Sequence, residues 1–430
     1  MHRVECGGAS LGAPREVSMR LLIVAALLLF SSAPSFAQWQ VRAGGNSLHN
    51  GAVDASGPES AQDRWFVPMA AWFGQPVFVE GDTVVTTWLT DAPMEERGVI
   101  VALHLTTGEV AWTRILPMDF PSDWSGYACA MRDGKVYATR AGNTNSSYLY
   151  ALDAATGDTV WRSEDLVDFY VTEGPAFAAN GDLLVPTPGS VTRIRATDGT
   201  RVYQSPRGGG MSGGFEPVVV GDTYYIRHGA VGDRLAAHDL ATGDFLYWST
   251  SIGTAQLGLF AGQDGTIYVP TDSSLYAFTD TGSSLTEKWV SPSLASCSFS
   301  TFAIGPDGSV YSYRVESGSV VVVRLDPETG LEIAASQPIL NASSIVPGHM
   351  AVDRYGTLFV SNGQSELFAF NPDLSLLWER SVPRSEGGPS LAADGTLLVS
   401  GDTGVFAFLG TVFWDGFESG DTSAWSATVP

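Results

Sequence analysis

The sequence of 430 residues has very little positive charge. Lysine occurs at two positions only, Lys135 and Lys288, and lysine and arginine form no cluster anywhere in the chain. The formal net charge is −23, although only 16% of the residues are charged. A surface this acidic repels phosphate backbones and anionic lipid headgroups, so nucleic acid is a poor candidate partner. The scarcity of charged residues also argues against long solvated helices.

The sequence also lacks an apolar run long enough to span a membrane. The run Leu21–Phe30 has ten residues, whereas a transmembrane helix needs roughly 20. It follows Met19-Arg20 and precedes Ser35-Phe36-Ala37, an order that is typical of a secretory signal peptide and its cleavage site. We therefore predict a signal peptide over residues 1–37, with translation starting at Met19. No cysteine follows the cleavage pattern, so we expect a soluble exported protein, periplasmic or extracellular, without a lipid anchor.

Motifs for binding metals or phosphates are missing as well. The glycine run Arg207–Phe215 lacks the Lys-Ser/Thr pair of a phosphate-binding loop, so we interpret it as a flexible loop. The histidines that remain after cleavage show neither HxH nor HxxxH spacing, and they give no support for a metal site. These histidines are His49, His104, His228, His238 and His349.

Glycine, at 48 residues, and aromatic residues, at 11%, are plentiful. A tight turn followed by a strand recurs eight times, at intervals of 39–52 residues. A second hairpin follows each copy, as in LYALDAATGDTVW at Leu149–Trp161, so that each unit contains four strands. Four-stranded units of this length in a row predict a β-propeller. The eight turns begin at Gly81, Asp133, Asn180, Gly221, Asp264, Asp307, Tyr355 and Asp394.

The eighth unit has a truncated second hairpin, Val405–Gly410, which stops before its last strand. The segment Asp63–Val67 precedes the first full unit and contains an unpaired tryptophan, so we predict that it completes the eighth sheet. The prediction is an all-β protein, an eight-bladed β-propeller of four-stranded antiparallel blades over residues 63–410. A lead-in segment, 38–62, precedes it. The aromatic tail 411–430 resembles the ends of unrelated secreted bacterial proteins, which suggests either a sorting signal or a flexible end that packs on the propeller.

The second hairpin carries the pattern Ala151-x-Asp153-x-x-Thr156-Gly157-x-x-x-Trp161. This pattern resembles the repeat of pyrroloquinoline-quinone-type eight-bladed propellers. Physically, the glycine can adopt a positive φ at the turn, and the tryptophan can bury about 150–250 Å² between neighbouring blades. We therefore predict a structural role in blade docking for these positions. They are Ala102, Gly108, Trp112, Ala151, Gly157, Trp161, Ala237, Gly243 and Trp65.

The resemblance includes quinoprotein dehydrogenases, which have an adjacent Cys-Cys disulfide over the cofactor, a calcium site and a catalytic aspartate. This chain has no adjacent cysteine pair. Cys6 lies upstream of the cleavage site, and Cys129 and Cys297 are predicted four blades apart, too far for a disulfide. We predict no catalytic, metal-binding or cofactor-binding residue and no cofactor. A divergent quinoprotein-type enzyme and a hydrolase that uses channel-mouth carboxylates are the enzymatic alternatives.

Two loops that join consecutive blades are rich in acidic and aromatic residues, Pro117–Tyr127 and Ser163–Glu173. In a propeller such loops gather at one mouth of the channel, so we predict a binding patch for a protein or peptide partner. The alternative is that the aromatic side chains pack inward beneath the loops. The expected protein is a non-catalytic monomer, with outer-membrane-assembly propellers among its relatives and carbohydrate binding as a further alternative. The candidate partner-binding residues are Asp119, Phe120, Asp123, Trp124, Asp168, Phe169 and Tyr170.

Overall fold

The structure is a computed structural model. The predicted signal peptide and the predicted C-terminal tail fall outside the described residues. The structure describes residues 40–41, 44–72, 74–140, 146–168, 174–187, 189–207, 216–228, 234–252, 258–271, 274–292, 302–341 and 349–410.

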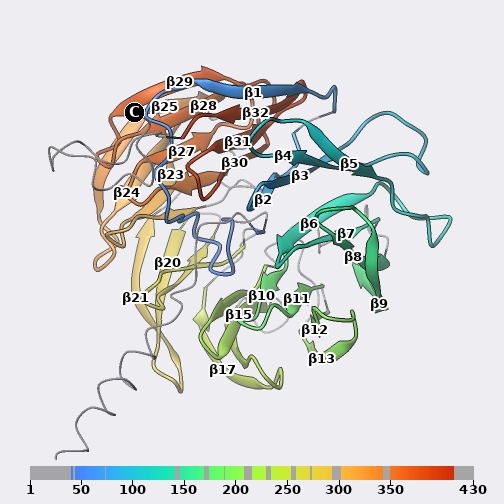
Figure 1. The fold of residues 1–430 in the computed structure, drawn as a ribbon. Helices are drawn as coiled ribbons and strands as arrows, with labels where there is room; N and C mark the ends of the chain where they lie inside the picture. Colours follow the sequence, from blue (N-terminus) through green and yellow to red (C-terminus); the bar gives the residue numbers. More distant parts are fainter. Residues whose placement is uncertain are drawn as a thin grey trace, which may run out of the picture. The chain divides into compact units, whose positions relative to one another are not determined.

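The described residues form eight four-stranded antiparallel sheets without an α-helix, arranged in order as the blades of a propeller (Figure 1). First strands of successive blades contact one another, which places them at the centre of the ring. Blades 1 to 4 are β2 (Phe78–Glu80), β3 (Thr83–Trp88), β4 (Val99–His104) and β5 (Val110–Arg114); β6 (Tyr127–Arg132), β7 (Lys135–Thr139), β8 (Ser146–Asp153) and β9 (Thr159–Asp168); β10 (Ala176–Phe177), β11 (Leu183–Pro186), β12 (Ser190–Ile194) and β13 (Arg201–Pro206); and β14 (Val218–Val220), β15 (Thr223–His228), β16 (Arg234–Asp239) and β17 (Phe245–Ser251).

The second half of the ring has the same construction, and the chain order of the strands continues through blade 7. Blades 5 to 7 are β18 (Phe260–Ala261), β19 (Ile267–Pro270), β20 (Ser274–Asp280) and β21 (Leu285–Pro292); β22 (Ala303–Ile304), β23 (Val310–Glu316), β24 (Ser319–Leu325) and β25 (Glu332–Asn341); and β26 (Met350–Val352), β27 (Leu358–Ser361), β28 (Glu366–Phe370) and β29 (Leu376–Ser381). The repeat count therefore predicted the blade number correctly.

Blade 8 is assembled from both ends of the propeller, as predicted. It contains β30 (Gly387–Leu391), β31 (Leu397–Ser400), β32 (Gly404–Phe408) and, as its outer strand, β1 (Asp63–Pro68). β1 pairs antiparallel with β32, with Trp65 opposite Ala407. The N-terminal strand thus closes the ring and removes the exposed edge that β32 would otherwise present.

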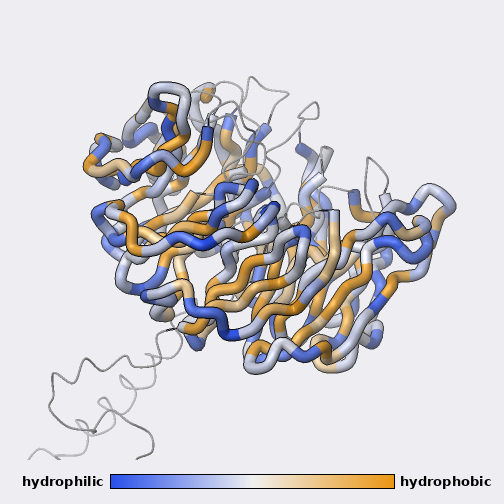
Figure 2. Tube along the Cα trace, turned by 90° about the horizontal axis from the view of Figure 1, so that it is seen from above, coloured by the Kyte–Doolittle hydropathy of each residue, from blue (hydrophilic) through white to orange (hydrophobic). Residues whose placement is uncertain are grey.

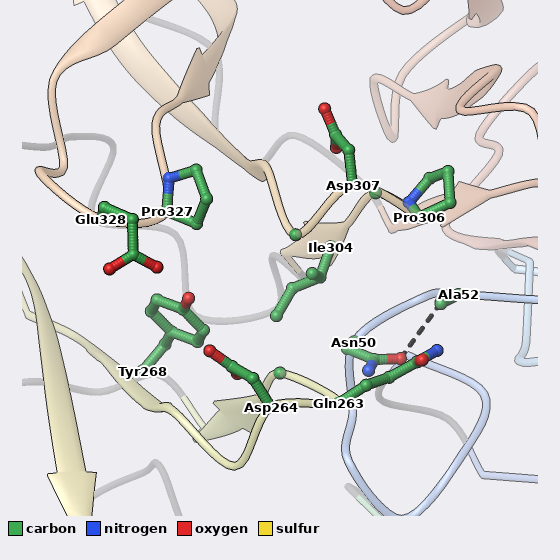
Figure 3. A pocket seen from close by; sticks show the side chains of 13 residues that line it. Asn50, Ala52, Gln263, Asp264, Tyr268, Ile304, Pro306, Asp307, Pro327 and Glu328 are labelled. Atoms are coloured by element: carbon green, nitrogen blue, oxygen red, sulfur yellow. Dashed lines mark hydrogen bonds between the residues drawn. The ribbon is translucent and has the colours of Figure 1, made fainter.

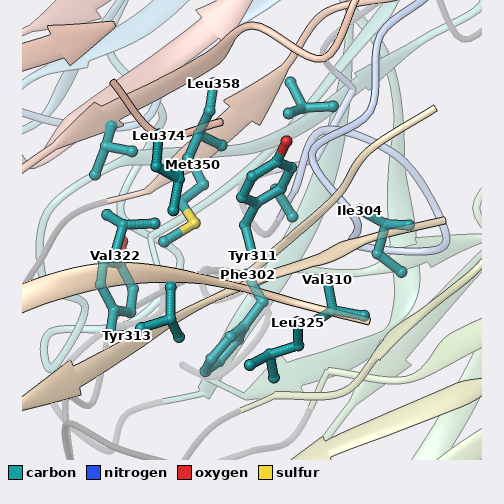
Figure 4. Close-up of a cluster of buried hydrophobic side chains, with 14 of the residues drawn as sticks. Phe302, Ile304, Val310, Tyr311, Tyr313, Val322, Leu325, Met350, Leu358 and Leu374 are labelled. Atoms are coloured by element: carbon teal, nitrogen blue, oxygen red, sulfur yellow. The ribbon is translucent and has the colours of Figure 1, made fainter. Parts of the chain in front are cut away.

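The core lies between the blades, because each sheet is covered on both faces by its neighbours. Figure 2 shows hydrophobic residues along the strands and hydrophilic residues at the turns. One cluster joins blades 6 and 7, where Tyr311 and Val322 gather with Met350 and Leu358 (Figure 4). Burial of these apolar faces is the main favourable term in holding the ring together.

The described lead-in residues, 40–41 and 44–62, include several that bond to the innermost strands of the ring. The Asn50 side chain is fully buried and donates to Ala261 O at 3.0 Å. The segment therefore ties blades 2 to 7 together across the centre. Its bonds to these blades run from Met131 N to Gln40 O, Phe177 N to Ser47 Oγ, Val219 N to Ser47 O, Ala261 N to Leu48 O, Ile304 N to Asn50 O and Val352 N to Gly51 O.

A recurrent hydrogen bond links neighbouring blades at their outer strands. At five junctions a tryptophan indole N–H donates to a backbone carbonyl near the second turn of the next blade, at 2.8–3.0 Å. The acceptor at the junction from blade 7 to blade 8 is Pro58 of the lead-in segment, which stands where the truncated hairpin has no turn of its own. The donor and acceptor pairs are Trp65 and Leu105, Trp112 and Ala154, Trp161 and Ala196, Trp289 and Pro327, and Trp378 and Pro58.

In blades 3 and 6, which lack the tryptophan, an arginine supplies the same bond. Arg324 stands on β24 where other units have alanine, and its guanidinium donates to Pro372 O at 2.7 Å. The turn of blade 7 explains the replacement, because Leu374, with φ +64°, occupies the position at which other turns have glycine. Leu374 is buried, so an indole has no space there. Arg193 donates to Leu240 O at 2.7 Å in the same way.

Replacing Arg324 with alanine is expected to lower the free energy of unfolding by about 2 kcal/mol, because a charge-assisted hydrogen bond between blades is lost. Adding Ala334→Trp should not restore stability while Leu374 fills the place of the turn glycine. The triple variant Arg324→Ala/Ala334→Trp/Leu374→Gly rebuilds the common junction and should recover most of the loss. Urea unfolding checks this, and a double variant as stable as the wild type would contradict it.

Candidate functional site

The loop Pro117–Tyr127 joins β5 to β6 and is held by a buried carboxylate. Asp123 is fully buried, and its Oδ2 accepts the backbone N–H groups of Asp119 at 2.7 Å and Phe120 at 3.1 Å. Its position shows that it fixes the loop conformation and offers no surface to a partner. We therefore leave Asp123 out of the surface considered below.

Trp124, another of the predicted residues, takes part in a stack of two indoles and a guanidinium. The Arg97 guanidinium lies 5.0 Å from the Trp72 ring centroid and 5.2 Å from that of Trp124. Arg97 Nε donates to Ala92 O at 3.1 Å, which fixes the orientation of the guanidinium. All three stacked side chains are half-buried, so each leaves an edge exposed to solvent.

A second stack lies on blade 2 and includes Phe120. The Tyr148 ring stacks on Phe120 at 5.9 Å, and the Arg162 guanidinium covers Tyr148 at 4.1 Å. Arg162 also pairs with Asp119 at 2.9 Å, and Asp119 accepts the Tyr150 hydroxyl at 2.5 Å. Burial, followed by this hydrogen bond to Asp119, raises the pKa of Tyr150, so the phenol stays protonated and donates.

A buried arginine anchors the loops that carry the first stack. Arg140 is fully buried and donates to Leu116 O at 2.7 Å and to Met94 O. Its own carbonyl accepts the N–H of Trp124 at 3.2 Å. Burial lowers the pKa of the guanidinium, and the charges of Asp123 and Glu95 oppose this effect. The loops of blades 1 and 2 are therefore anchored to one cation, which makes a rigid base.

The structure brings Asp119, Phe120 and Trp124 into what we call the loop surface. Asp168 ends β9 opposite Ser146, and the predicted residues Phe169 and Tyr170 lie outside the described residues. Sequence reasoning missed four participants. Tyr148 and Arg162 lie within the repeat, where a structural role was the natural assignment, and nothing in the spacing links Trp72 and Arg97 to the loop. The loop surface consists of Trp72, Arg97, Asp119, Phe120, Trp124, Tyr148 and Arg162.

The predicted blade-docking residues lie at the blade junctions. The rings of Trp65, Trp112 and Tyr203 lie so close to Gly108, Gly157 and Gly243 that a Cβ on each glycine would approach a ring atom within 2.8 Å. The alanines are fully buried, each opposite an aromatic residue of its own blade. These pairs are Ala102 with Trp112, Ala151 with Trp161, and Ala237 with Tyr247.

A pocket of about 280 Å³ lies between blades 5 and 6, at the strand ends opposite to the loop surface (Figure 3). The turns that follow β18 and β22 form two of its walls, and Asn50 of the lead-in segment forms a third. Carboxylates of Asp264 and Glu328 stand beside the buried Tyr268 ring, and the proline rings add apolar surface. The pocket thus combines apolar walls with negative charge.

Metal ligands, membrane-spanning helices and cysteines were each sought in the described part of the chain. It contains no group of three or more His, Cys, Asp or Glu residues that could hold a metal ion. It also contains no helix that is long and apolar enough to cross a membrane. Cys129 is buried, with its thiol 3.6 Å from Tyr127 O, whereas Cys297 lies outside the described residues.

An eight-bladed ring closed by an N-terminal strand, with tryptophan-to-carbonyl junctions, defines a propeller of the pyrroloquinoline-quinone repeat type. The chain belongs to the family described as outer membrane protein assembly factor BamB. The family model matches residues 49–286, which are more than half of this chain. The match begins within the lead-in segment and includes Asn50 and Gly51, which bond to blades 6 and 7. No curated protein matches the chain.

Solved structures of similar fold include BamB and dehydrogenases. BamB from Moraxella catarrhalis is 16% identical, with a TM-score of 0.54 over 81% of this chain and 97% of that one. Quinohemoprotein alcohol dehydrogenase from Comamonas testosteroni is 13% identical, with a TM-score of 0.63 over 89% and 82%. A europium-containing methanol dehydrogenase is also 13% identical, with a TM-score of 0.60 over 85% and 90%. At these identities the likeness shows the fold alone.

Proposed function

We propose that the protein is an exported, non-catalytic propeller that binds a protein or peptide partner through the loop surface of blades 1 and 2. The observation that carries the proposal is the pair of cation–aromatic stacks, Arg97 with Trp72 and Trp124, and Arg162 with Tyr148. Half-buried tryptophan, tyrosine and arginine side chains are the types that dominate binding energy at protein interfaces. Because their neighbours already fix them, little conformational entropy is lost when a partner binds.

The charge of the surroundings indicates what kind of partner fits. Acidic residues Asp91, Glu95 and Glu96 are exposed beside the first stack, and the whole chain carries a formal net charge of −23. A basic or neutral partner segment with apolar side chains is complementary to this surface. Family membership supports a protein partner, since the family is described as an assembly factor of the outer membrane. The signal-peptide pattern at the N-terminus supports export.

The double variant Trp124→Ala/Tyr148→Ala is expected to weaken retention of the partner by at least about 10-fold, because each stack loses an aromatic ring. The immobilised mature protein is incubated with an extract of the cell envelope, and bound proteins are compared between variants. Phe245→Ala is the matched control, since Phe245 is 45% exposed but lies on blade 4. Thermal unfolding checks that both variants fold.

Two results would contradict the proposal. The first is a bound species that wild type and all variants retain equally, since that partner would not use the loop surface. The second is a stoichiometric bound chromophore after addition of pyrroloquinoline quinone and calcium, which would support the quinoprotein alternative.

A further inference from the structure

The pocket between blades 5 and 6 has a filled counterpart elsewhere in the ring. In blade 2, Arg132 ends β6 just before the turn Asp133-Gly134. In blade 5, Gly262 holds the same register position, and the turn Gln263–Gly265 has one residue more. Arg132 extends into the space between blades 2 and 3. The repeat therefore permits a direct comparison between a junction that contains a guanidinium and one that contains an open pocket.

At the filled junction, the turn that follows β10 receives the guanidinium. Arg132 Nη1 donates to Ala178 O at 3.3 Å and Nη2 to Ala179 O at 3.2 Å. The guanidinium carbon lies 5.2 Å from the Phe177 ring centroid, and Arg132 Nε donates to Asp133 at 3.3 Å. An aromatic wall, two carbonyls and one carboxylate thus hold this cation.

Blade 6 presents the same framework to the open pocket. Its turn closes with a bond from Gly305 N to Ser309 O at 2.8 Å, as the turn of blade 3 closes from Ala178 N to Asp182 O at 2.9 Å. Gly305 and Pro306 therefore stand where the two acceptor residues of Arg132 stand. Ile304 corresponds to Phe177, since both precede these turns at the end of the inner strand. All three residues line the pocket.

Carboxylates line the open pocket, as they line its filled counterpart. Asp264 corresponds to Asp133, the carboxylate that pairs with Arg132. Glu328 adds a second carboxylate, at a position where the turn of blade 3 has Thr197, and its Oε1 pairs with Lys288 at 3.0 Å. Burial raises the pKa of Tyr268, and the negative charge of Asp264 raises it further. The same negative charge, which disfavours a phenolate here, favours a bound cation.

We propose that this pocket binds the guanidinium group of an arginine side chain on a partner protein, in the manner in which Arg132 fills the junction between blades 2 and 3. Proline and tyrosine side chains pack against the alkyl stem, while Asp264 and Glu328 accept the charged head. The site is distinct from the loop surface, because the two lie at opposite ends of the strands.

The probe for this proposal is Nα-acetyl-arginine amide, added to protein labelled at the isoleucine δ1 methyl groups. We expect a saturable shift of the Ile304 methyl resonance, since Ile304 lines the pocket. Nα-acetyl-citrulline amide has the same shape without the charge and should give at most about one-tenth of the apparent affinity. Nα-acetyl-lysine amide tests whether the planar guanidinium is required, and it should bind more weakly than the arginine probe.

Neutralising the two carboxylates should weaken binding of the arginine probe by at least about 10-fold. Asp264→Asn keeps an oxygen that can accept the Thr266 N–H, to which Asp264 now bonds at 3.0 Å, so the double variant Asp264→Asn/Glu328→Gln should keep its fold. Asp222→Asn is the control, because Asp222 lies exposed in the first turn of blade 4. Gln263→Arg should place an internal guanidinium in the pocket and abolish the titration.

Equal shifts with arginine and citrulline probes would overturn the proposal. Unchanged binding by Asp264→Asn/Glu328→Gln, or by Gln263→Arg, would do so as well. The loop-surface variant Trp124→Ala/Tyr148→Ala should bind the arginine probe normally. A failed pocket titration and a failed partner capture are therefore separate results, each of which refutes only one of the two proposals.

Discussion

Replacing Trp161 with alanine is expected to lower the free energy of unfolding by about 3–5 kcal/mol, as other large-to-small changes of buried aromatic residues do. Trp161 is 8% exposed and its ring centroid lies 5.8 Å from that of Tyr137. The indole lies against Gly199 and donates to Ala196 O at 3.0 Å. Alanine removes the ring and the bond together, so blades 2 and 3 lose their outer contact. Urea unfolding at equilibrium measures the change.

Two companion variants divide this effect into its causes. Trp161→Phe keeps an aromatic ring but has no N–H, and should cost about 1–2 kcal/mol, chiefly through the buried carbonyl of Ala196 that loses its donor. Gly199→Ala tests the contact from the other side. Its Cβ would lie 2.6 Å from Trp161 Cε3, at a φ of +76° that suits glycine. A loss below about 1 kcal/mol for Trp161→Ala would contradict the docking role, since buried aromatic truncations cost far more.

The repeat determines which parts of the fold could be predicted from sequence. The spacing of turns specifies the number of blades, and the incomplete eighth hairpin specifies that a strand must come from elsewhere. Both predictions depend on local hydrogen-bonding geometry that is repeated along the chain. The position of β1, Asp63–Pro68, agrees with the predicted segment to within one residue.

The degenerate units show where pattern matching stops being sufficient. In the amino-acid sequence alone, Arg324 and Ala334 look like the loss of the repeat motif. In three dimensions the arginine compensates for Leu374 in the next blade, 40 residues or more along the chain. A unit cannot be interpreted alone, because its outer residue must fit the turn of its neighbour.

The loop surface was predicted in part, for a comparable reason. Acidic and aromatic composition identified Phe120 and Trp124, which do face other side chains of blades 1 and 2. Composition could not distinguish the fully buried Asp123 from the accessible positions, because the backbone N–H groups that it caps become visible only in the structure. Arg162 and Arg97 were missed because cation–aromatic contacts join strands and loops that no sequence period connects.

Acidification from pH 7 to pH 4 is expected to destabilise the protein through buried histidines. His49 and His228 have the large pKa shifts, and burial lowers the pKa of His238 in the same direction. Burial lowers the pKa of His49 to about 4, an effect that the backbone of Leu259 partly opposes. Burial, with the charges of His238 and Arg207, lowers the pKa of His228 to about 4. Below an unfolded-state pKa of about 6.5 the unfolded chain takes up protons that the folded state excludes. Stability is therefore complete above pH 6.5 and falls until the pH reaches about 4.

His49 and His228 should each lower the free energy of unfolding by about 2 kcal/mol at pH 5 and by about 3 kcal/mol at pH 4. Carboxylates whose pKa the fold lowers, such as Asp394, act only at lower pH. Burial raises the pKa of Asp353, which opposes the trend as the pH approaches its titration range. The interval between pH 6.5 and 5 thus reports mainly on the histidines, and urea unfolding at constant ionic strength measures it.

The variant His49→Asn isolates the contribution of His49 to this pH dependence. His49 adopts a φ of +54°, a conformation that asparagine tolerates well, so the change removes the titrating ring with little backbone strain. His49 lies between Leu48 and Asn50, whose carbonyls accept bonds from blades 5 and 6; a proton on His49 would therefore weaken the segment that holds the ring together. The variant should lose about 2 kcal/mol less than the wild type between pH 7 and pH 5. An unchanged pH dependence would show that the lead-in segment stays in place when His49 is charged.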